Sequence, residues 1–378
     1  MSEAIIFAGS AEKNPSLYQR LRVPLGDPAA WFEIGGTRIA MVRDIERERV
    51  RKFALADRVV CPADFAPPEG LDADRETATA QSLATAIKAL GGLKARVDRT
   101  FPMIYAHFLL AAGIELTYDP CQGVLDRRVK SDEEIELIAK AQSVTESVME
   151  QICATIARSR VASDGTLEDN GLSLTSERVR FMAAEAFMRR GFSMSHGAIV
   201  ATTPHVADCH HAGEGPLVTG QPVIVDLFPR DDSSRYWGDC TRTVVHGQPS
   251  DRVLAMHAAV FDAKRAATEK LVAGGTAEKV HHAVIERLVA HGYRVSRGTT
   301  TDEPTIQHGT GHGIGLDVHE PILLDDGGGV LLAHEVFTIE PGLYGRSDGG
   351  VRIEDMLVVE NGPARNLNRL HEGLDWRI

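Results

Sequence analysis

A glycine-rich segment of the chain carries three histidines within twelve residues: His308, His312 and His319. The spacing of His308 and His312 would place both on one face of a helix, but glycines at 309, 311, 313 and 315 disfavour a helix there. Glycines instead let the backbone and side chains approach a ligand closely. A surface loop with incidental histidines is the weaker alternative. The segment is therefore a candidate binding or catalytic site.

Two aspartates lie at the ends of predicted neighbouring strands. Asp226 closes the apolar run 223–225, where an unpaired carboxylate would be costly to bury, so a positive partner is expected. Asp239 begins the next strand after the turn-rich loop 229–238, and hairpin pairing would bring the two carboxylates together. Taken alone, each aspartate also fits a cap or turn residue.

Two glutamates follow in later predicted strands. Glu340 ends the strand 336–339, and Pro341 stops the strand pairing immediately after it. In the run 351–354, strand alternation puts Arg352 and Glu354 on one face, which by itself predicts an ion pair between them.

Together these residues supply oxygen and nitrogen donors and no thiolate. Four carboxylates and at least one imidazole suit Mn, Co, Fe or Zn in a two-metal site, with ions ~3.5–4 Å apart and bridged by shared carboxylates. Two divalent cations would neutralise the four carboxylates.

The elements that must position these residues fall into two groups. Up to about residue 125, strands at 4–9, 31–42 (turned at Gly35-Gly36), 58–61, 94–98 and 114–118 alternate with helices at 75–90 and 103–112, which predicts a small α/β domain. A boundary follows near 126–130, because Ser131 and Glu134 have capping-box spacing and open a long amphipathic helix. Beyond it we predict an α+β domain with helices at 176–190, 252–272 and 277–291 and strands at 222–228, 240–246, 336–339 and 351–359.

Composition narrows the class of protein. The chain has 378 residues, 43% apolar and 25% charged, which are values of a folded globular protein with room for two domains. Its net charge of -12 opposes binding to a nucleic-acid backbone. No apolar run approaches the ~20 residues that span a bilayer. Five cysteines without CxxC spacing favour reduced thiols. We expect a cytoplasmic protein with no nucleic-acid or membrane partner.

The motifs resemble those of the pita-bread metallopeptidases, which include Xaa-Pro aminopeptidases, prolidases, methionine aminopeptidases and creatinase. The stretches that carry the resemblance occur in family order: 44–49 (DIERER), 222–229 (PVIVDLFP), 238–243 (GDCTRT), the three-histidine segment, 340–344 (EPGLY) and 350–355 (GVRIED). The resemblance implies an α+β fold, with a creatinase-type N-terminal α/β domain over residues 1–126 and a pita-bread catalytic domain over residues 127–378.

The resemblance also implies roles for individual residues. The metal ligands would be Asp226, Asp239, His312, Glu340 and Glu354, with Asp239 and Glu354 in the bridging positions. His319 would stabilise the oxyanion and Glu340 would shuttle a proton. His210 or His308 would assist the leaving nitrogen, and Arg352 would hold this corner of the site from behind.

Two departures from the family pattern affect loops. The loop between Asp226 and Asp239 is slightly longer than in many relatives, and Ala333-His334-Glu335 replaces a common Pro-Gly turn. Neither departure removes a ligand.

The function implied is hydrolysis of short proline-containing peptides at an Xaa-Pro bond by two divalent ions, Mn first and Co, Fe or Zn as alternatives. The long loop favours an Xaa-Pro aminopeptidase. The alternative is an Xaa-Pro dipeptidase (prolidase), in which Arg346 could grip the terminal carboxylate of the dipeptide. The intact ligand set disfavours a creatinase-like hydrolase and a non-catalytic binding descendant, and the N-terminal domain disfavours a methionine aminopeptidase. The resemblance also implies a homodimer.

Overall fold

The chain divides after Arg127 into two units, Met1–Arg127 and Arg128–Ile378, and the structure, a computed structural model, describes residues 2–377. Each unit has its own cluster of buried apolar side chains. Among the described residues, no helix combines the length and apolar character needed to cross a membrane.

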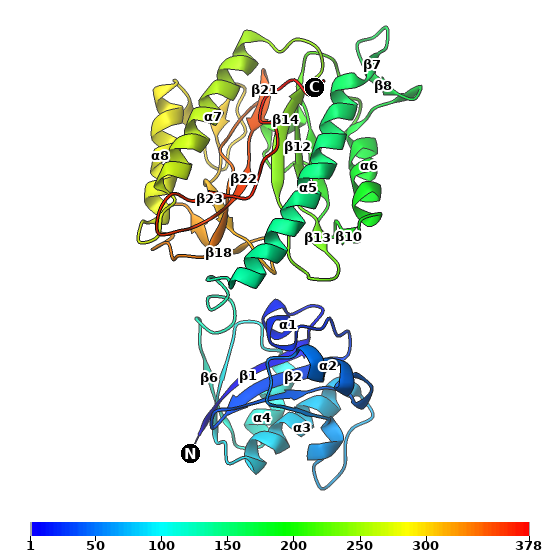
Figure 1. Ribbon diagram of the computed structural model, residues 1–378, viewed down its shortest axis with the longest axis vertical. Coiled ribbons are helices and arrows are strands. Elements are labelled where there is room, and N and C mark those ends of the chain that lie inside the picture. The colour runs from blue at the N-terminus through cyan, green and yellow to red at the C-terminus, as the bar shows by residue number, and fades with distance from the viewer. Residues whose placement is uncertain (1, 378) are drawn as a thin grey trace. The chain divides into compact units, whose positions relative to one another are not determined.

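The N-terminal unit is built on one six-stranded sheet of order β4-β3-β2-β1-β5-β6. Alternate residues of β1, such as Ile6 and Ala8, are buried beneath two helices, α3 and α4, as period-two alternation requires. Figure 1 shows these helices together on one side of the sheet. The strands are β1 (Glu3–Ser10), β2 (Pro28–Ile34), β3 (Thr37–Met41), β4 (Arg58–Val60), β5 (Lys94–Val97) and β6 (Glu115–Tyr118), and the helices are α1 (Pro15–Leu21), α2 (Arg47–Phe53), α3 (Arg75–Ala89) and α4 (Met103–Ala111).

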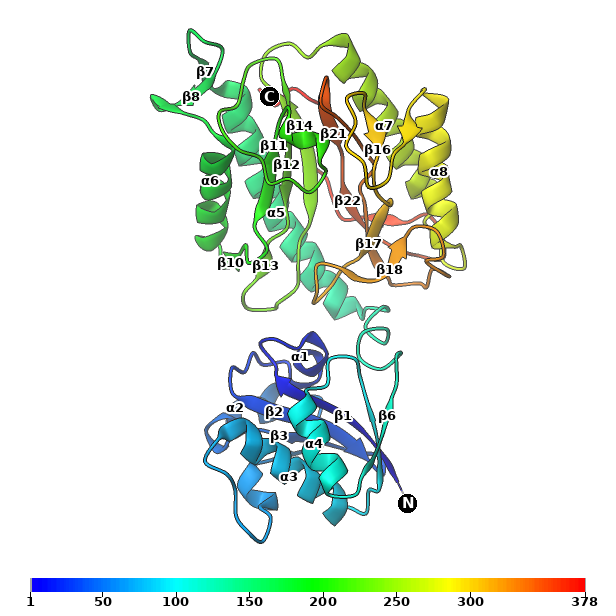
Figure 2. The same ribbon diagram turned by 180° about the vertical axis from the view of Figure 1, so that it is seen from behind.

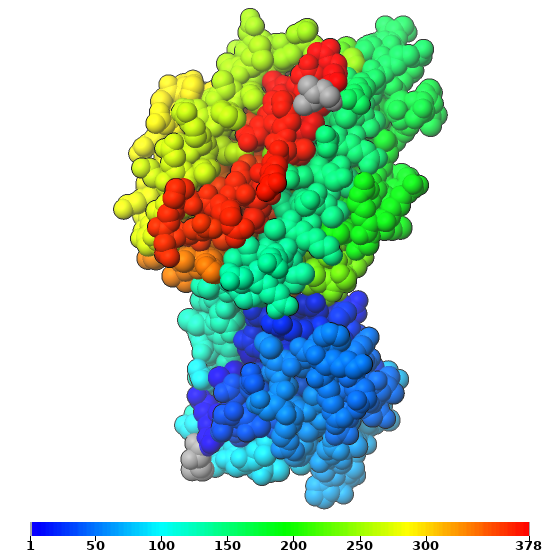
Figure 3. All heavy atoms as spheres, viewed as in Figure 1, coloured from blue at the N-terminus to red at the C-terminus, as the bar shows by residue number. Residues whose placement is uncertain are grey.

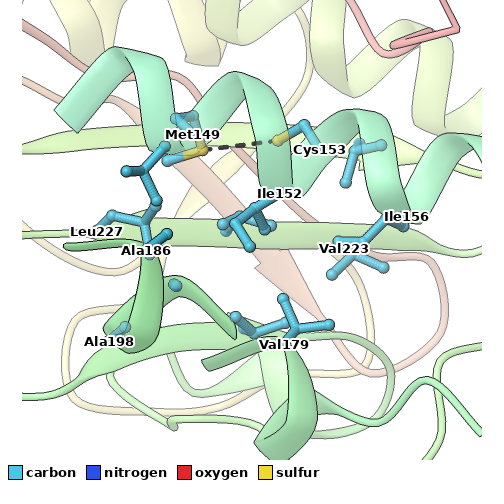
Figure 4. Close-up of a cluster of buried hydrophobic side chains, with 14 of the residues drawn as sticks. Met149, Ile152, Cys153, Ile156, Val179, Ala186, Ala198, Val223 and Leu227 are labelled. Carbon is cyan, nitrogen blue, oxygen red and sulfur yellow. Dashed lines mark hydrogen bonds between the residues drawn. The ribbon is translucent and has the colours of Figure 1, made fainter. Parts of the chain in front are cut away.

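The C-terminal unit opens with α5 (Asp132–Arg158), the longest helix described. Its capping box is formed: Ser131 Oγ accepts from Glu134 N at 3.2 Å, and Glu134 Oε2 accepts from Ser131 N at 2.8 Å. Its apolar side packs on α6 (Ser176–Met188) and on a three-stranded sheet, and Figure 4 shows Ile152 and Ile156 of α5 with Val179 of α6 in this cluster. This part of the core supports the strands that carry the first two aspartates.

Most strand pairs of the C-terminal unit are antiparallel, as predicted. One sheet has the order β11-β12-β14, one β18-β17-β19-β22-β23, and one β15-β16-β20-β21. Two smaller sheets have the orders β7-β8-β9 and β10-β13. The strands are β7 (Arg160–Val161), β8 (Leu167–Asp169), β9 (Leu172–Ser173), β10 (Phe192–Ser193), β11 (Ala198–Ala201), β12 (Pro222–Leu227), β13 (Arg230–Asp231), β14 (Cys240–Val245), β15 (Arg294–Val295), β16 (Thr305–Ile306), β17 (Gly311–Gly313), β18 (Glu320–Leu324), β19 (Val336–Ile339), β20 (Gly342–Gly345), β21 (Gly349–Arg352), β22 (Asp355–Val358) and β23 (Arg365–Asn366).

Two helices, α7 (Asp251–Lys270) and α8 (Ala277–Ala290), lie side by side and cover the second half of this unit (Figure 2). The C-terminal segment up to Arg377, red in Figure 3, runs along the surface beside α5. Glu146 of α5 accepts hydrogen bonds from the backbone of Arg369 and Leu370, at 2.8 Å each, while His257 of α7 contacts Glu372 O at 2.7 Å. The C-terminal segment thus ties α5 to α7.

The predicted single strand 351–359 is wrong. β21 ends at Arg352 and pairs with β20, whereas β22 begins at Asp355 and pairs with β19. The chain therefore passes from one sheet to another at Ile353 and Glu354.

Candidate active site

The antiparallel pair β12–β14 brings Asp226 and Asp239 to one place. Asp226 lies opposite Thr241 in the register, and Asp239 directly precedes β14. The loop between the two strands leaves their sheet, because its strand β13 pairs with β10 rather than with β12 or β14. The hairpin pairing predicted from the sequence is present.

The remaining donors come from strands of the neighbouring sheets. His312 is the middle residue of β17, Glu340 directly follows β19, and Glu354 lies where the chain changes sheet. His312 Nε2 lies 3.8 Å from Asp239 Oδ2 and 3.6 Å from Glu340 Oε1. One ligand atom from each of Asp239, His312 and Glu354 lies within 4.8 Å of the other two.

All of these side chains line one cavity of about 650 Å³. Its apolar walls include Ile199, Phe228, Val318 and Leu323. The structure brings together in it the candidate ligands and the other candidate catalytic residues of the sequence analysis, Arg346 excepted: His210, Asp226, Asp239, His308, His312, His319, Glu340, Arg352 and Glu354.

Three carboxyl groups of the cavity, those of Asp239, Glu340 and Glu354, have raised pKa values. Burial, together with the charges of Glu354 and Asp226, raises the pKa of Asp239 well above its usual value. Burial and the charges of Glu340 and Asp226 do the same to the pKa of Glu354. Burial raises the pKa of Glu340 to about 7, against the charge of Arg352. The site holds more negative charge than its own cations can balance.

Burial favours the neutral form of two histidines of the cavity, His312 and His319. Burial lowers the pKa of His312 to about 3, and the charge of His319 acts in the same direction. His312 Nδ1 lies 3.1 Å from Gly313 O, which assigns the proton to Nδ1 and turns the lone pair of Nε2 toward the carboxylates. Burial also lowers the pKa of His319, whose ring packs edge-on against that of His312 with centroids 4.2 Å apart.

These residues fit divalent cations. Buried carboxylates that raise one another's pKa, and a neutral imidazole nitrogen aimed at them, are the donors that Mn, Co, Fe or Zn accept. Asp226 Oδ1 is buried without a hydrogen-bond partner in the described chain, although Arg352 Nη2 donates to Oδ2 at 2.6 Å. Thr241 Oγ1 donates to Glu354 Oε2 at 2.7 Å, which holds that carboxylate in place.

The ion pair predicted between Arg352 and Glu354 is wrong. Arg352 pairs with Asp226, because the change of sheet after β21 separates the two residues that strand alternation would place together. Arg352 Nη1 also donates to the hydroxyl of Tyr344 at 3.0 Å, and that hydroxyl lies 2.6 Å from His308 Nε2. His308 Nδ1 lies 2.7 Å from Gly309 O, so both of its ring nitrogens are engaged.

Sequence reasoning missed Tyr344, Thr241 and Thr338. The hydroxyl of Thr338 accepts from His312 N at 3.1 Å. Each of the three lies inside or beside one of the stretches named in the sequence analysis, but only the folded chain shows which residue of the site it contacts. Arg346, by contrast, lies on an exposed turn, where it donates to Thr300 O at 3.3 Å, and it does not line the cavity.

The sequence matches the model of metallopeptidase family M24 over residues 136–361, well over half of the chain. The chain belongs to metallopeptidase family M24. This family is dinuclear and metal-dependent. The M24 match covers the strands that carry all five candidate ligands.

Individual relatives of this M24 chain are named as dipeptidases. It is 32% identical over 244 residues to the probable dipeptidase PepE of Mycobacterium bovis, covering 64% of this chain and 59% of that protein. It is 30% identical over 242 residues to the Xaa-Pro dipeptidase of Pyrococcus furiosus, covering 63% of each. The matches thus span about three fifths of these curated relatives.

The fold of the M24 chain is that of a solved Xaa-Pro dipeptidase from Bacillus anthracis. The TM-score is 0.81 at 22% identity, and the superposition covers 99% of this chain and 94% of the other. The expected pita-bread fold with a smaller N-terminal α/β domain is therefore confirmed.

Proposed function

We propose that this chain is a dinuclear metal-dependent Xaa-Pro peptidase that acts as a dipeptidase. The observation that carries the proposal is the single cavity in which Asp226, Asp239, His312, Glu340 and Glu354 meet. These five residues would hold the two ions. A pair of divalent ions there supplies Lewis-acid chemistry, which lowers the pKa of water and polarises a carbonyl.

The side chains around these ligands have distinct tasks in the proposed reaction. Glu340 takes a proton from the attacking water and returns it toward the leaving nitrogen of proline. The neutral imidazole of His319 donates a hydrogen bond to the oxyanion as it develops. His308 is held at both ring nitrogens and positions its neighbours, so His210, which also lines the cavity, is the better candidate to assist the leaving nitrogen.

The choice of dipeptidase over aminopeptidase reverses the expectation from the loop length. It is supported by the names of the relatives, one a probable dipeptidase and two Xaa-Pro dipeptidases. Arg346 is not retained as the grip on the dipeptide's carboxylate, because its side chain lies on an exposed turn with Thr300 and Asp302.

The test is a comparison of kcat/KM for an Xaa-Pro dipeptide and for the same peptide extended by one or two residues. We expect the dipeptide to be preferred by on the order of 100-fold, since a longer peptide would bury the polar groups of its extra residues without hydrogen-bond partners. Arg346→Ala should leave that ratio unchanged. Preference for the extended peptide would identify an aminopeptidase instead.

Three further features are proposed with this function. Manganese is the first candidate metal, to be tested by adding Mn, Co, Fe and Zn separately to metal-free protein.

A homodimer is proposed from the resemblance, and sedimentation of the purified protein would reveal a monomer if that is wrong. The cytoplasmic location stays a prediction.

A further inference from the structure

The loop between β17 and β18 delivers His319 to the cavity, and its shape is fixed by the residue next to it. Glu320 Oε1 accepts hydrogen bonds from Leu316 N at 3.1 Å and from Asp317 N at 3.3 Å. One carboxylate oxygen thus connects the end of the loop to its middle. His319 lies between these two points.

The other oxygen of Glu320 is held from outside the loop. Lys130 Nζ donates to Glu320 Oε2 at 2.7 Å, and the side chains of both residues are almost completely buried, at 3% and 1% exposure. Lys130 is itself fixed at its backbone, where its N–H donates to His334 O at 3.0 Å. A buried ion pair in which each partner has a second anchor is a rigid connection.

The backbone of the loop packs closely on the pair. A Cβ added to Gly315 would lie 2.8 Å from Glu320 Oε2 and 2.9 Å from Lys130 Cε, so a larger residue at this position would displace the ion pair. The loop backbone therefore lies directly on the ion pair.

We propose that Lys130 and Glu320 are positioning residues for His319. Neither residue lines the cavity, so they act on the reaction only through the loop. The inference rests on the proposed role of His319 at the oxyanion. That role requires the imidazole to be held in one orientation, because a small misplacement of a catalytic group is costly.

A double-mutant cycle tests this inference. Glu320→Gln keeps an oxygen for the loop N–H groups but loses the ion pair, and it should lower kcat by on the order of 10-fold with little change in KM. In a His319→Ala background the same change should lower kcat by less than about 2-fold, since the group it positions is absent. The cycle is measured with the peptide that the enzyme cleaves best, so failure of the Xaa-Pro assignment leaves the comparison intact.

If Glu320→Gln does not fold, the double variant Lys130→Met/Glu320→Gln replaces it in the cycle, because the double variant leaves no unpaired buried charge. The same loss of kcat is expected. The matched control is Glu335→Gln, since Glu335 is equally buried, pairs with Arg128 and accepts from Leu332 N. It should lower the unfolding temperature and leave kcat unchanged. The inference would be overturned if Glu320→Gln lowered kcat equally with and without His319, or if it caused loss of bound metal. It would also be overturned if either Glu320→Gln or His319→Ala left kcat unchanged.

Discussion

At the scale of single residues, the site is defined by carboxyl groups placed where ionisation is unfavourable. A surface aspartate is stabilised by water, but Asp239 and Glu354 are buried beside other carboxylates, and their pKa values rise. Such a cluster is costly for a folded protein unless cations bind it. The cost of the empty cluster is thus the physical basis for assigning metals to it.

Asp239→Ala and Glu354→Ala should each abolish binding of two ions and lower kcat/KM by on the order of 100-fold or more, because each removes a carboxylate proposed to bridge both ions. Metal content of the purified variants, measured by elemental analysis, is the readout. Asp232→Ala is the control, since Asp232 lies in the same β12–β14 connection but is exposed. Two ions bound at full stoichiometry in Asp239→Ala would show that this ligand is misassigned.

At the scale of elements, the sequence was most informative where a strand ends in a carboxylate. Asp226 and Glu340 could be located because apolar strand residues stop at them, and Asp239 because a predicted strand starts at it. His312 could be located because glycines surround it. The hydrogen-bond partners could not be predicted. Arg352 pairs with a residue 126 positions away, and a local alternation pattern pointed to Glu354 instead. The short helices α1 and α2 were also missed, because seven residues carry little periodic signal.

The turn before β19 contains a residue in an unfavourable backbone conformation. His334 has φ of 69°, a left-handed conformation that disfavours a side chain. His334→Gly should therefore raise the free energy of unfolding by about 1 kcal/mol, with activity unchanged. Urea unfolding would measure it, with His282→Gly inside α8 as a control that should be destabilised. A less stable His334→Gly would mean that the contact of His334 with Asp132 outweighs the strain.

At the scale of the whole molecule, metal binding and folding should be linked through protons. In the chelated protein, Glu340 has a pKa of about 7, against ~4.3 in an unfolded chain, and the pKa values of Asp239 and Glu354 are shifted in the same direction. The folded state then binds more protons than the unfolded state, so stability falls as pH rises through 7. Between pH 7 and 9, His308 and His312, with pKa values of about 3, are neutral in both states.

The chelated protein should accordingly lose unfolding temperature as pH rises from 7 to 9, while the metal-loaded protein should not, because bound cations favour the ionised carboxylates. Thermal unfolding of both forms in the same buffers measures the difference. Parallel pH dependence in the two forms would contradict a metal site built from these carboxylates.

The most direct test of the central claim is to remove the metal, add it back, and measure hydrolysis of an Xaa-Pro dipeptide while counting bound ions. We expect chelation to abolish hydrolysis, a divalent ion to restore it, and activity to saturate as about two ions bind per chain. We also expect that Asp239→Ala is not restored at any ion concentration that saturates the unmodified protein. Full hydrolysis by protein shown to contain no metal, or restoration of Asp239→Ala to normal turnover, would contradict it.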